Sequence, residues 1–261
     1  MNKTKIEWCD MTWNPVTGCL HGCEYCYARG IARRFGGYWD EIRLRHCGAT
    51  REIHDIEKVM YRHTTGKNRC VPVHNVKTAY PFGFDPTFHR YKLDEYKNKS
   101  GRTIFVCSMA DLFGNWVPDE WIEKVFEACE QAPQHKYIFL TKNPKRYEQF
   151  IDKPMPDNMW FGFSQTEEKH IGFSTHESWN VFVSMEPLMC DLSKKAAPEE
   201  IKWVIIGAET GNRKDKIIPK LDWIIDIILF CRERNIPVFM KSSLKEIWAE
   251  PLIQEFPWRD E

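Results

Sequence analysis

Residues 203–207 read Trp203-Val204-Ile205-Ile206-Gly207, an uninterrupted apolar run of aromatic and β-branched side chains that ends in glycine. A short run of this composition predicts a β-strand. Because it does not alternate with polar residues, we expect the strand to be buried on both faces, as strands are in parallel sheets.

Five other runs of the same kind occur in the chain. They are Thr103 to Met109 (TIFVCSM), Tyr137 to Thr141 (YIFLT), Met159 to Ser164 (MWFGFS), Val181 to Met185 (VFVSM) and Pro237 to Lys241 (PVFMK). Longer segments of helical character lie between them. Strands and helices that alternate in this way predict a right-handed parallel α/β array, either an open sheet or a barrel.

Two of the intervening segments predict helices with one apolar face. Residues 119–131 begin with acidic residues after Pro118, which is typical of a helix start. Residues 222–234 have the same periodicity. The apolar positions are Trp121, Val125, Phe126 and Cys129 in the first helix, and Ile224, Ile227, Ile228 and Cys231 in the second.

Polar side chains follow nearly every predicted strand at the point where its apolar run stops. They are Ser108 and Asp111, Thr141 and Lys142, Ser164 and Gln165, Glu186, Glu209, and Lys241. The C-terminal ends of parallel strands collect ligands and catalytic groups, so these residues predict one shared site. The alternative is that each of them only marks the entry to a loop.

Size and charge limit the class of protein. A chain of 261 residues with 43% hydrophobic residues suits one large α/β domain, and we expect residues 1–261 to form a single domain. Lys plus Arg equals Asp plus Glu at 37 each, so no net charge draws the whole molecule to nucleic acid or to a membrane. The N-terminus has no apolar targeting segment, and no apolar stretch is long enough to span a bilayer, which predicts a cytoplasmic protein without a membrane partner.

Residues 30–102 differ from the rest of the chain. They contain 15 Lys or Arg against 8 Asp or Glu, and we expect an irregular basic insertion or lid. Its aromatic residues include Tyr38, Trp39, Tyr61, Tyr80, Phe82, Phe84 and Phe88. Aromatic and basic groups together suit a nucleobase, a nucleotide or a nucleic-acid strand, and they also suit a lid that only packs down.

The sequence Gly18-Cys19-Leu20-His21-Gly22-Cys23-Glu24-Tyr25-Cys26-Tyr27 places three cysteines in the pattern C-x3-C-x2-C. Clustered thiolates are the ligands of iron-sulfur clusters, and three of them leave one iron of a 4Fe-4S cluster open to a ligand. The rival interpretations are a zinc site, with His21 or a distant cysteine as fourth ligand, and a set of structural thiols.

Seven further cysteines lack this spacing. Cys107, Cys129 and Cys231 lie in apolar stretches and are expected to be core thiols. An auxiliary cluster held by Cys9, Cys47 and Cys70 is a less favoured possibility, and Cys190 carries no expectation.

With Tyr25 in the aromatic place, the loop resembles the C-x3-C-x-aromatic-C loop of the radical S-adenosylmethionine (radical SAM) superfamily. The resemblance implies a partial (β/α) barrel of parallel strands, a 4Fe-4S cluster on Cys19, Cys23 and Cys26, and S-adenosylmethionine as second cofactor. It also implies a reducing partner such as flavodoxin or ferredoxin. One-electron cleavage of S-adenosylmethionine would give a 5'-deoxyadenosyl radical that abstracts hydrogen from a substrate.

The chain also resembles a narrower, phage-associated group of radical SAM relatives of unknown function. The matching stretches are residues 6–8, 12–15, 107–113, 140–146, 183–188, 203–211 and 237–241. The chain departs from the usual pattern at Met185, at Gly207-Ala208-Glu209-Thr210-Gly211, and at Ser242, which follows Lys241 where the group usually has glutamine.

The superfamily resemblance implies roles for the polar strand ends. Tyr25 belongs to the cofactor loop, and Ser108 with Asp111 would bind the methionyl amine. Lys142 would meet the carboxylate, although an ion pair with Glu186 would equally explain it. Ser164 or Gln165 would lie near the ribose.

Glu186, Glu209 and Lys241 are the expected catalytic residues. A carboxylate at the end of an apolar strand is costly to bury unless it is paired or used. Each glutamate is expected to bind ribose hydroxyls, orient substrate or accept a proton, and the alternative is that it caps a following helix.

Three hypotheses for function remain at this stage. The first is a radical SAM enzyme that acts on a nucleic-acid component in repair or modification. The second is a radical SAM enzyme that modifies a peptide or a small metabolite. The third is a non-catalytic zinc-binding protein.

Overall fold

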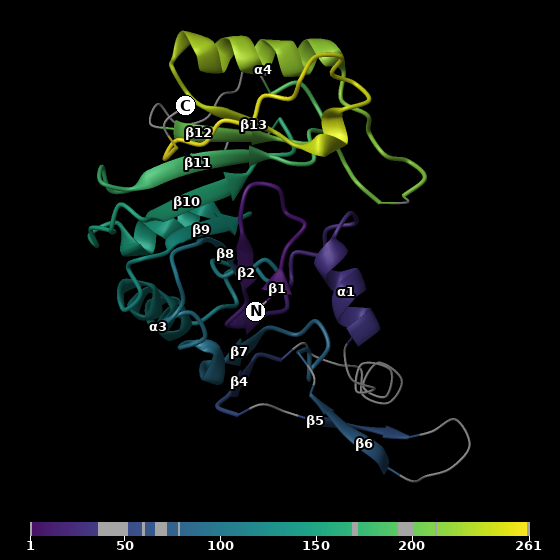
Figure 1. The fold of residues 1–261 in the computed structure, drawn as a ribbon, viewed down its shortest axis with the longest axis vertical. Coiled ribbons are helices and arrows are strands. Elements are labelled where there is room, and N and C mark those ends of the chain that lie inside the picture. The colour runs from purple at the N-terminus through teal and green to yellow at the C-terminus, as the bar shows by residue number, and fades with distance from the viewer. Residues whose placement is uncertain are drawn as a thin grey trace. The chain divides into compact units, whose positions relative to one another are not determined.

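A computed structural model describes residues 2–35, 52–58, 61–65, 72–77, 79–168, 172–192, 201–211 and 213–259 (Figure 1). Of residues 2–3, 61–65 and 72–77 it describes the backbone alone. Tyr38, Trp39, Cys47 and Cys70 lie outside the described residues, and so do the roles expected of them.

The fold is built on an eight-stranded sheet in the order β1-β2-β8-β9-β10-β11-β12-β13. The strands are β1 (Asn2–Lys3), β2 (Met11–Trp13), β8 (Thr103–Val106), β9 (Lys136–Thr141), β10 (Met159–Ser164), β11 (Asn180–Met185), β12 (Ile201–Ile206) and β13 (Val238–Met240). From β8 to β13 every neighbouring pair is parallel. This order, with the crossovers it requires, is that of a partial (β/α) barrel, and the expected fold class is confirmed.

All six strands expected from the apolar runs are present, although their ends differ. β8 ends at Val106 because Cys107 adopts a positive φ of 57° and begins a turn. The inward faces of the strands pack into one aromatic core, which accounts for their unbroken apolar sequences. Its members are Trp8, Phe105, Ile138, Trp160, Phe182, Trp203, Ile205 and Phe239.

Three helices are described: α1 (Tyr27–Phe35), α3 (Asp119–Glu130) and α4 (Leu221–Glu233). The bounds of α3 and α4 agree with the expected helices to within one residue at each end. Every apolar position assigned to their inner faces is buried, including the Cys129 and Cys231 thiols. Figure 1 shows α4 lying along β12 and β13.

Not every crossover is an α-helix. Between β9 and β10 the described chain forms only the 3-10 helix η2 (Pro144–Phe150), and another, η4 (Ser242–Leu244), follows β13. Pro144 at the start of η2 has no N–H to donate, which suits the first turn of a helix. The alternation of strands with long helices is therefore less regular than the sequence indicates.

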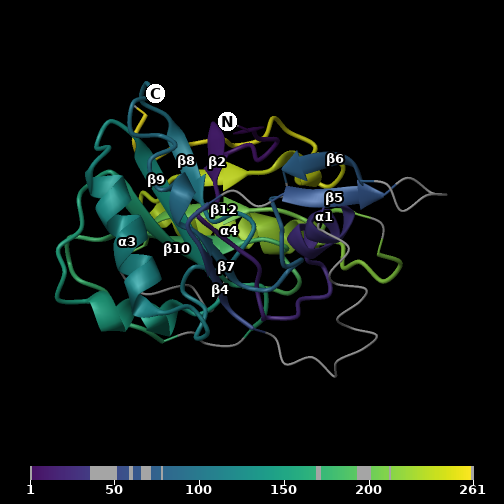
Figure 2. The same cartoon turned by 90° about the horizontal axis from the view of Figure 1, so that it is seen from below.

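The region expected to be irregular contains short strands. β3 (Val16–Thr17), β7 (Thr87–His89) and β4 (His54–Ile56) form one small sheet. β5 (Tyr61–Thr65) and β6 (Pro72–Lys77) form an antiparallel ribbon, and Figure 2 shows the two strands side by side. A 3-10 helix, η1 (Arg90–Lys92), follows β7.

The contacts divide the chain into two compact units. Unit 1 comprises residues 1–11, 101–105 and 134–261, and unit 2 comprises residues 12–100 and 106–133. A single domain over residues 1–261 stays a prediction.

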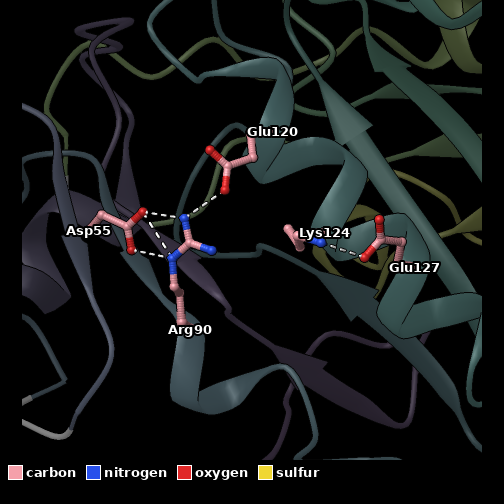
Figure 3. Close-up of polar contacts among 5 residues, drawn as sticks. All are labelled: Asp55, Arg90, Glu120, Lys124 and Glu127. Atoms are coloured by element: carbon pink, nitrogen blue, oxygen red, sulfur yellow. Dashed lines mark hydrogen bonds and ion pairs between the residues drawn. The ribbon is translucent and has the colours of Figure 1, made fainter.

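Within unit 2, Arg90 joins the small sheet to α3 (Figure 3). Its guanidinium donates to both carboxylate oxygens of Asp55 at 2.8 Å and 3.1 Å, and to Glu120 at 2.8 Å. Its hydrogen bonds raise the pKa of Arg90 above the ordinary value. The bonds to Asp55 have the larger effect and the bond to Glu120 the smaller one. The neighbouring pair Lys124 and Glu127, at 2.9 Å, lies within α3 itself.

Candidate functional site

The cysteine loop runs from Gly18 to the start of α1 in unit 2. Gly18 has φ 87°, and a Cβ there would lie 2.2 Å from the backbone oxygen of Asp85, so only glycine fits. Its N–H donates to the carbonyl of Met109 at 2.9 Å, and the Cys19 N–H donates to Phe84 at 3.2 Å. The loop therefore starts from a fixed point beside the segment that follows β8.

The three cysteines of the loop are free thiols and half-buried. Burial raises the pKa of the Cys19 thiol to about 12, and the charges of Asp111, Cys23 and Cys26 add to this effect. The influence of Cys23 and Cys26 on Cys19 means that the three sulfurs lie in one neighbourhood. A metal binds cysteine as the thiolate, so binding here would release the thiol protons, and the bound cation would stabilise thiolates that otherwise repel one another.

The sulfur of Cys26 lies at the start of α1. The backbone N–H of Arg29 donates to Cys26 Sγ at 3.4 Å, which places a helix N-terminus and its positive dipole end against the sulfur. This contact suits a metal-bound thiolate. In the described part of the chain, however, no three His, Cys, Asp or Glu side chains are gathered at metal-binding distance, so cluster binding requires the three thiols to draw closer together.

His21 connects the loop to the segment after β8. Its Nε2 lies 2.6 Å from the Asp111 carboxylate, and its ring packs edge-on against Trp116 with ring centroids 4.8 Å apart. Asp111 is buried, and its other oxygen accepts the N–H of Phe113 at 3.1 Å. The Asp111 carboxylate, expected at the methionyl amine, thus holds the cysteine loop in place.

Ser108 lies in the turn that follows β8. Its hydroxyl donates to Asn14 Oδ1 at 3.2 Å, and the same oxygen accepts the Met109 N–H at 2.9 Å. The hydroxyl of Tyr27 donates to the Ser108 carbonyl at 2.7 Å. Ser108 therefore sits beside the cysteine loop, while Tyr25 is half-buried within the loop.

In unit 1, Glu186, Gly207 and Lys241 stand next to one another at the C-terminal ends of β11, β12 and β13. They directly follow register partners of those strands. The Lys241 ammonium donates to the Glu186 carboxylate. A Cβ at Gly207 would lie 3.1 Å from Lys241 Cδ and 3.3 Å from Glu186 Cγ, so the missing side chain leaves room for the pair.

Two more polar groups lie on the same face of β10 and β11, Ser164 and Ser184, which are register partners. Ser184 is two residues before Glu186, so the two side chains share a face. The Ser184 hydroxyl is buried and has no hydrogen-bond partner in the part of the chain that the structure describes. Gln165 is buried next to Ser164, and Lys142 is half-buried at the end of β9.

Glu209 forms a local ion pair. Arg213, four residues later, donates to both of its carboxylate oxygens at 2.7 Å. These hydrogen bonds lower the pKa of Glu209 below its ordinary value, and they outweigh the opposing effect of desolvation. The carboxylate is covered by its own loop, so it is held ionised rather than placed to take up a proton near neutral pH.

Ser242 is the position at which the chain departs from the group of relatives that it resembles. It forms hydrogen bonds with the N-terminal segment. Its N–H and hydroxyl donate to the Glu7 carboxylate at 2.9 Å and 2.8 Å. Burial raises the pKa of the Cys9 thiol to about 12, and the charge of Lys241 opposes this rise in part. Cys9 therefore lies near the same strand end as Lys241. The position after Lys241 therefore anchors the N-terminus.

The structure thus brings the expected residues into two groups. Cys19, Cys23, Cys26, Tyr25, Ser108 and Asp111 belong to unit 2, whereas Lys142, Ser164, Gln165, Glu186, Glu209 and Lys241 belong to unit 1. Two residues that hold these groups in place were given no role from the sequence, Asn14 and Arg213, and His21 was considered only as a zinc ligand. Arg213 had a local signal, because it follows Glu209 by four positions.

The sequence matches no curated protein. Among solved structures, a mutant of spore photoproduct lyase is similar with a TM-score of 0.47 and 11% identity over 92% of this chain and 78% of that chain. Spore photoproduct lyase complexed with dinucleoside spore photoproduct is similar with a TM-score of 0.45 and 10% identity over 86% and 74% of the two chains. Both TM-scores are low, and the likeness carries no conclusion about chemistry.

In the described residues, no helix is long and apolar enough to cross a membrane. Residues 3–247 match the family described as "Protein of unknown function (DUF5131)". That description names no link to phages, so the expected phage association stays a prediction. Because the match spans nearly all of the sequence, the chain belongs to this family of unknown function.

Proposed function

We propose that the protein is a radical SAM enzyme in which Cys19, Cys23 and Cys26 bind three irons of a 4Fe-4S cluster. The observation that carries the proposal is the C-x3-C-x2-C loop itself. It begins at the constrained Gly18, keeps three free thiols in one neighbourhood and ends with a helix N–H directed at Cys26. When bound, such a cluster and S-adenosylmethionine supply a 5'-deoxyadenosyl radical for hydrogen abstraction.

The residues of the chain would position the cofactors. His21 and Asp111 fix the loop against the segment after β8 through their 2.6 Å contact. Ser108 is the proposed contact of the methionyl amine, because its hydroxyl belongs to a turn that also binds Asn14 and Tyr27.

In unit 1, Lys142 is the proposed partner of the methionyl carboxylate, with Ser164 and Gln165 near the ribose. Lys241 and Glu186 would hold substrate or move a proton between substrate and solvent. Glu209 would instead keep its loop in shape through Arg213. That these side chains act together with the cysteine loop is part of the proposal.

The test is anaerobic reconstitution with iron and sulfide, followed by reduction with S-adenosylmethionine and measurement of 5'-deoxyadenosine. The parent protein is expected to bind about four irons, as a single 4Fe-4S cluster requires, and to release 5'-deoxyadenosine. Cys23→Ala is expected to release none. The matched control is Cys190→Ala, since Cys190 is also half-buried and forms no disulfide, and its sulfur donates to the carbonyl of Thr166 at 3.8 Å, away from the cysteine loop in the sequence. Equal product from Cys23→Ala and from the parent would reject the proposal.

A zinc site is the second candidate, and the His21–Asp111 contact favours it. A histidine that binds zinc usually donates its other ring N–H to a carboxylate, and His21 has this arrangement two residues after Cys19. Three cysteines and His21 would then complete a tetrahedral site. Metal analysis of His21→Gln separates the two: a zinc protein would lose its metal, whereas the cluster protein would keep its iron.

The proposed substrate is a nucleic-acid component. The support is the excess of positive charge in residues 30–102 together with its aromatic residues. A peptide or small metabolite is the alternative, and turnover of such a compound by a protein that does not bind oligonucleotides at low salt would select it.

A further inference from the structure

Helix α1, which follows the cysteine loop directly, exposes a row of large apolar side chains. Tyr27 is 55% exposed, Ile31 37% and Phe35 56%. They are spaced by four residues and therefore lie on one side of the helix. Exposing two aromatic rings and an isoleucine in one row is unfavourable unless the surface has a partner.

The buried side of α1 accounts for its packing without these residues. Ala28 and Ala32 are buried and pack with Tyr80 and Met109. Because both alanines are small, the helix lies close to its unit and presents its other side to solvent. The row of Tyr27, Ile31 and Phe35 therefore contributes little to the core.

The charge of α1 is entirely positive. Its sequence YARGIARRF contains Arg29, Arg33 and Arg34 and no acidic residue. Arg34 follows Ile31 by three positions, so it lies beside the exposed row. Arginines in the last turn also complement the helix dipole, but the dipole does not explain the exposed rings.

Tyr27 is held in a fixed orientation. Its hydroxyl donates to the Ser108 carbonyl at 2.7 Å although the side chain is largely exposed. The ring therefore lies along the protein surface and cannot turn outward into a lipid bilayer, which argues against a membrane as the partner. A fixed, exposed ring is a stacking surface for a planar group.

Gly30 leaves the same side of the helix open. A Cβ at Gly30 would meet no atom within 4 Å, so packing does not require glycine there. Glycine inside a helix lowers stability relative to alanine. Its place, one turn from Tyr27 and next to Ile31, lets a flat ligand approach the backbone.

We propose that the exposed row of Tyr27, Ile31 and Phe35, with Arg34 beside it, binds single-stranded nucleic acid. Aromatic rings stack on unpaired bases, and arginines meet the phosphates. Tyr27 adjoins Cys26, so a strand bound here lies next to the proposed cluster loop. The inference rests on the proposed nucleic-acid substrate and deepens it by assigning the surface that binds a single strand, but the binding itself does not depend on the radical chemistry.

The test measures binding of the full-length reconstituted protein to fluorescein-labelled single-stranded oligothymidylate by anisotropy, at several salt concentrations. Phe35→Ala is expected to weaken binding about tenfold, the order of one lost stacking contact. Arg34→Glu is expected to weaken it and to reduce the slope of log affinity against log salt by about 0.7 or more. Tyr27→Phe keeps the ring and is expected to weaken binding less than Tyr27→Leu.

Matched controls come from α4, which exposes similar side chains. Leu229 is 55% exposed, and the side chain of Arg234 is 50% exposed. Leu229→Ala and Arg234→Glu are expected to leave oligonucleotide binding unchanged. Because every substituted side chain is exposed, all variants are expected to fold, and melting curves of each variant check this.

The outcomes separate the alternatives. If the α1 variants bind like the parent, or if the α4 controls weaken binding equally, the inference is wrong. It is also wrong if the parent protein does not bind the oligonucleotide and instead binds phosphatidylserine vesicles through α1. One outcome is that the α1 variants lose oligonucleotide binding but still form 5'-deoxyadenosine. This supports the binding surface and also the proposed chemistry. The other is that the parent binds the oligonucleotide through α1 but forms no 5'-deoxyadenosine, which rejects the proposed chemistry alone.

Discussion

Lys241 and Glu186 form an ion pair across Gly207, so the pair links β13 to β11 over the strand that lies between them. Neighbouring strands are about 4.8 Å apart, and the two side chains meet only because glycine leaves the space above β12 free. The side chains are 16% and 25% exposed, so the pair is shielded from water on most of its surface.

We predict that Glu186 and Lys241 are energetically coupled. In a double-mutant cycle with Glu186→Gln and Lys241→Met, urea unfolding is expected to give a coupling of about 1 kcal/mol, at the upper end for exposed pairs because this one is shielded. Gly207→Ala is expected to reduce that coupling, because a methyl group there crowds both side chains. Strict additivity of the two single substitutions would contradict the prediction.

A second prediction concerns His89 in β7 and acid stability. His89 is fully buried and bonded to Thr17 at 2.8 Å, and burial lowers its pKa from 6.5 to about 3. Below pH 6.5 the unfolded chain binds a proton here that the folded chain refuses, so stability falls by about 1.4 kcal/mol per pH unit down to the folded pKa. Above pH 6.5 both the folded and the unfolded chain hold this histidine neutral, so it adds nothing to the pH dependence of stability.

The measurement compares urea unfolding of the parent and of His89→Gln at pH 7 and pH 5. The parent is expected to lose about 2 kcal/mol more than the variant over this interval, because glutamine keeps a polar partner for Thr17 without titrating. Equal losses in the two proteins would show that His89 is not the group responsible.

A third prediction concerns Glu209, whose pKa is lowered by Arg213. A carboxylate with a lowered folded pKa adds stability above its unfolded pKa, and this contribution is lost as pH falls through the folded value. Glu209→Gln is therefore expected to destabilise the protein at pH 7 and to have less effect at pH 3. It is also expected to leave the pH profile of turnover between pH 6 and pH 8 unchanged, and loss of an acid limb from that profile would instead assign Glu209 the role of a proton acceptor in catalysis.

A fourth prediction uses two glycines of the cysteine loop and α1. Gly30→Ala is expected to raise the free energy of unfolding by about 0.5–1 kcal/mol, because nothing opposes the added methyl group and alanine favours the helix. Gly18→Ala is expected to destabilise strongly, since its Cβ would lie 2.2 Å from Asp85 O. Thermal or urea unfolding decides both, and similar effects of the two substitutions would contradict the described backbone.

The sequence predicted the elements of the fold well because the pattern of apolar residues in each strand and helix is local in the sequence. Unbroken apolar runs located β9 to β12 to within two residues, and the 3.6-residue periodicity located α3 and α4. It was less accurate at β8, where a turn that begins at Cys107 ends the strand three residues before the apolar run stops. The spacing of Cys19, Cys23 and Cys26 was equally local.

By itself, then, the sequence determined the parallel α/β class, the buried cores and the three closely spaced thiols. Only the tertiary structure decided which polar side chains meet, because residues distant along the chain become neighbours through strand register. His21 reaches Asp111, Glu186 reaches Lys241 and Glu7 reaches Ser242 across 90, 55 and 235 positions. No periodicity encodes such pairs, since each depends on how distant strands and loops align, and the pair of Glu186 and Lys241 depends also on the room that Gly207 leaves.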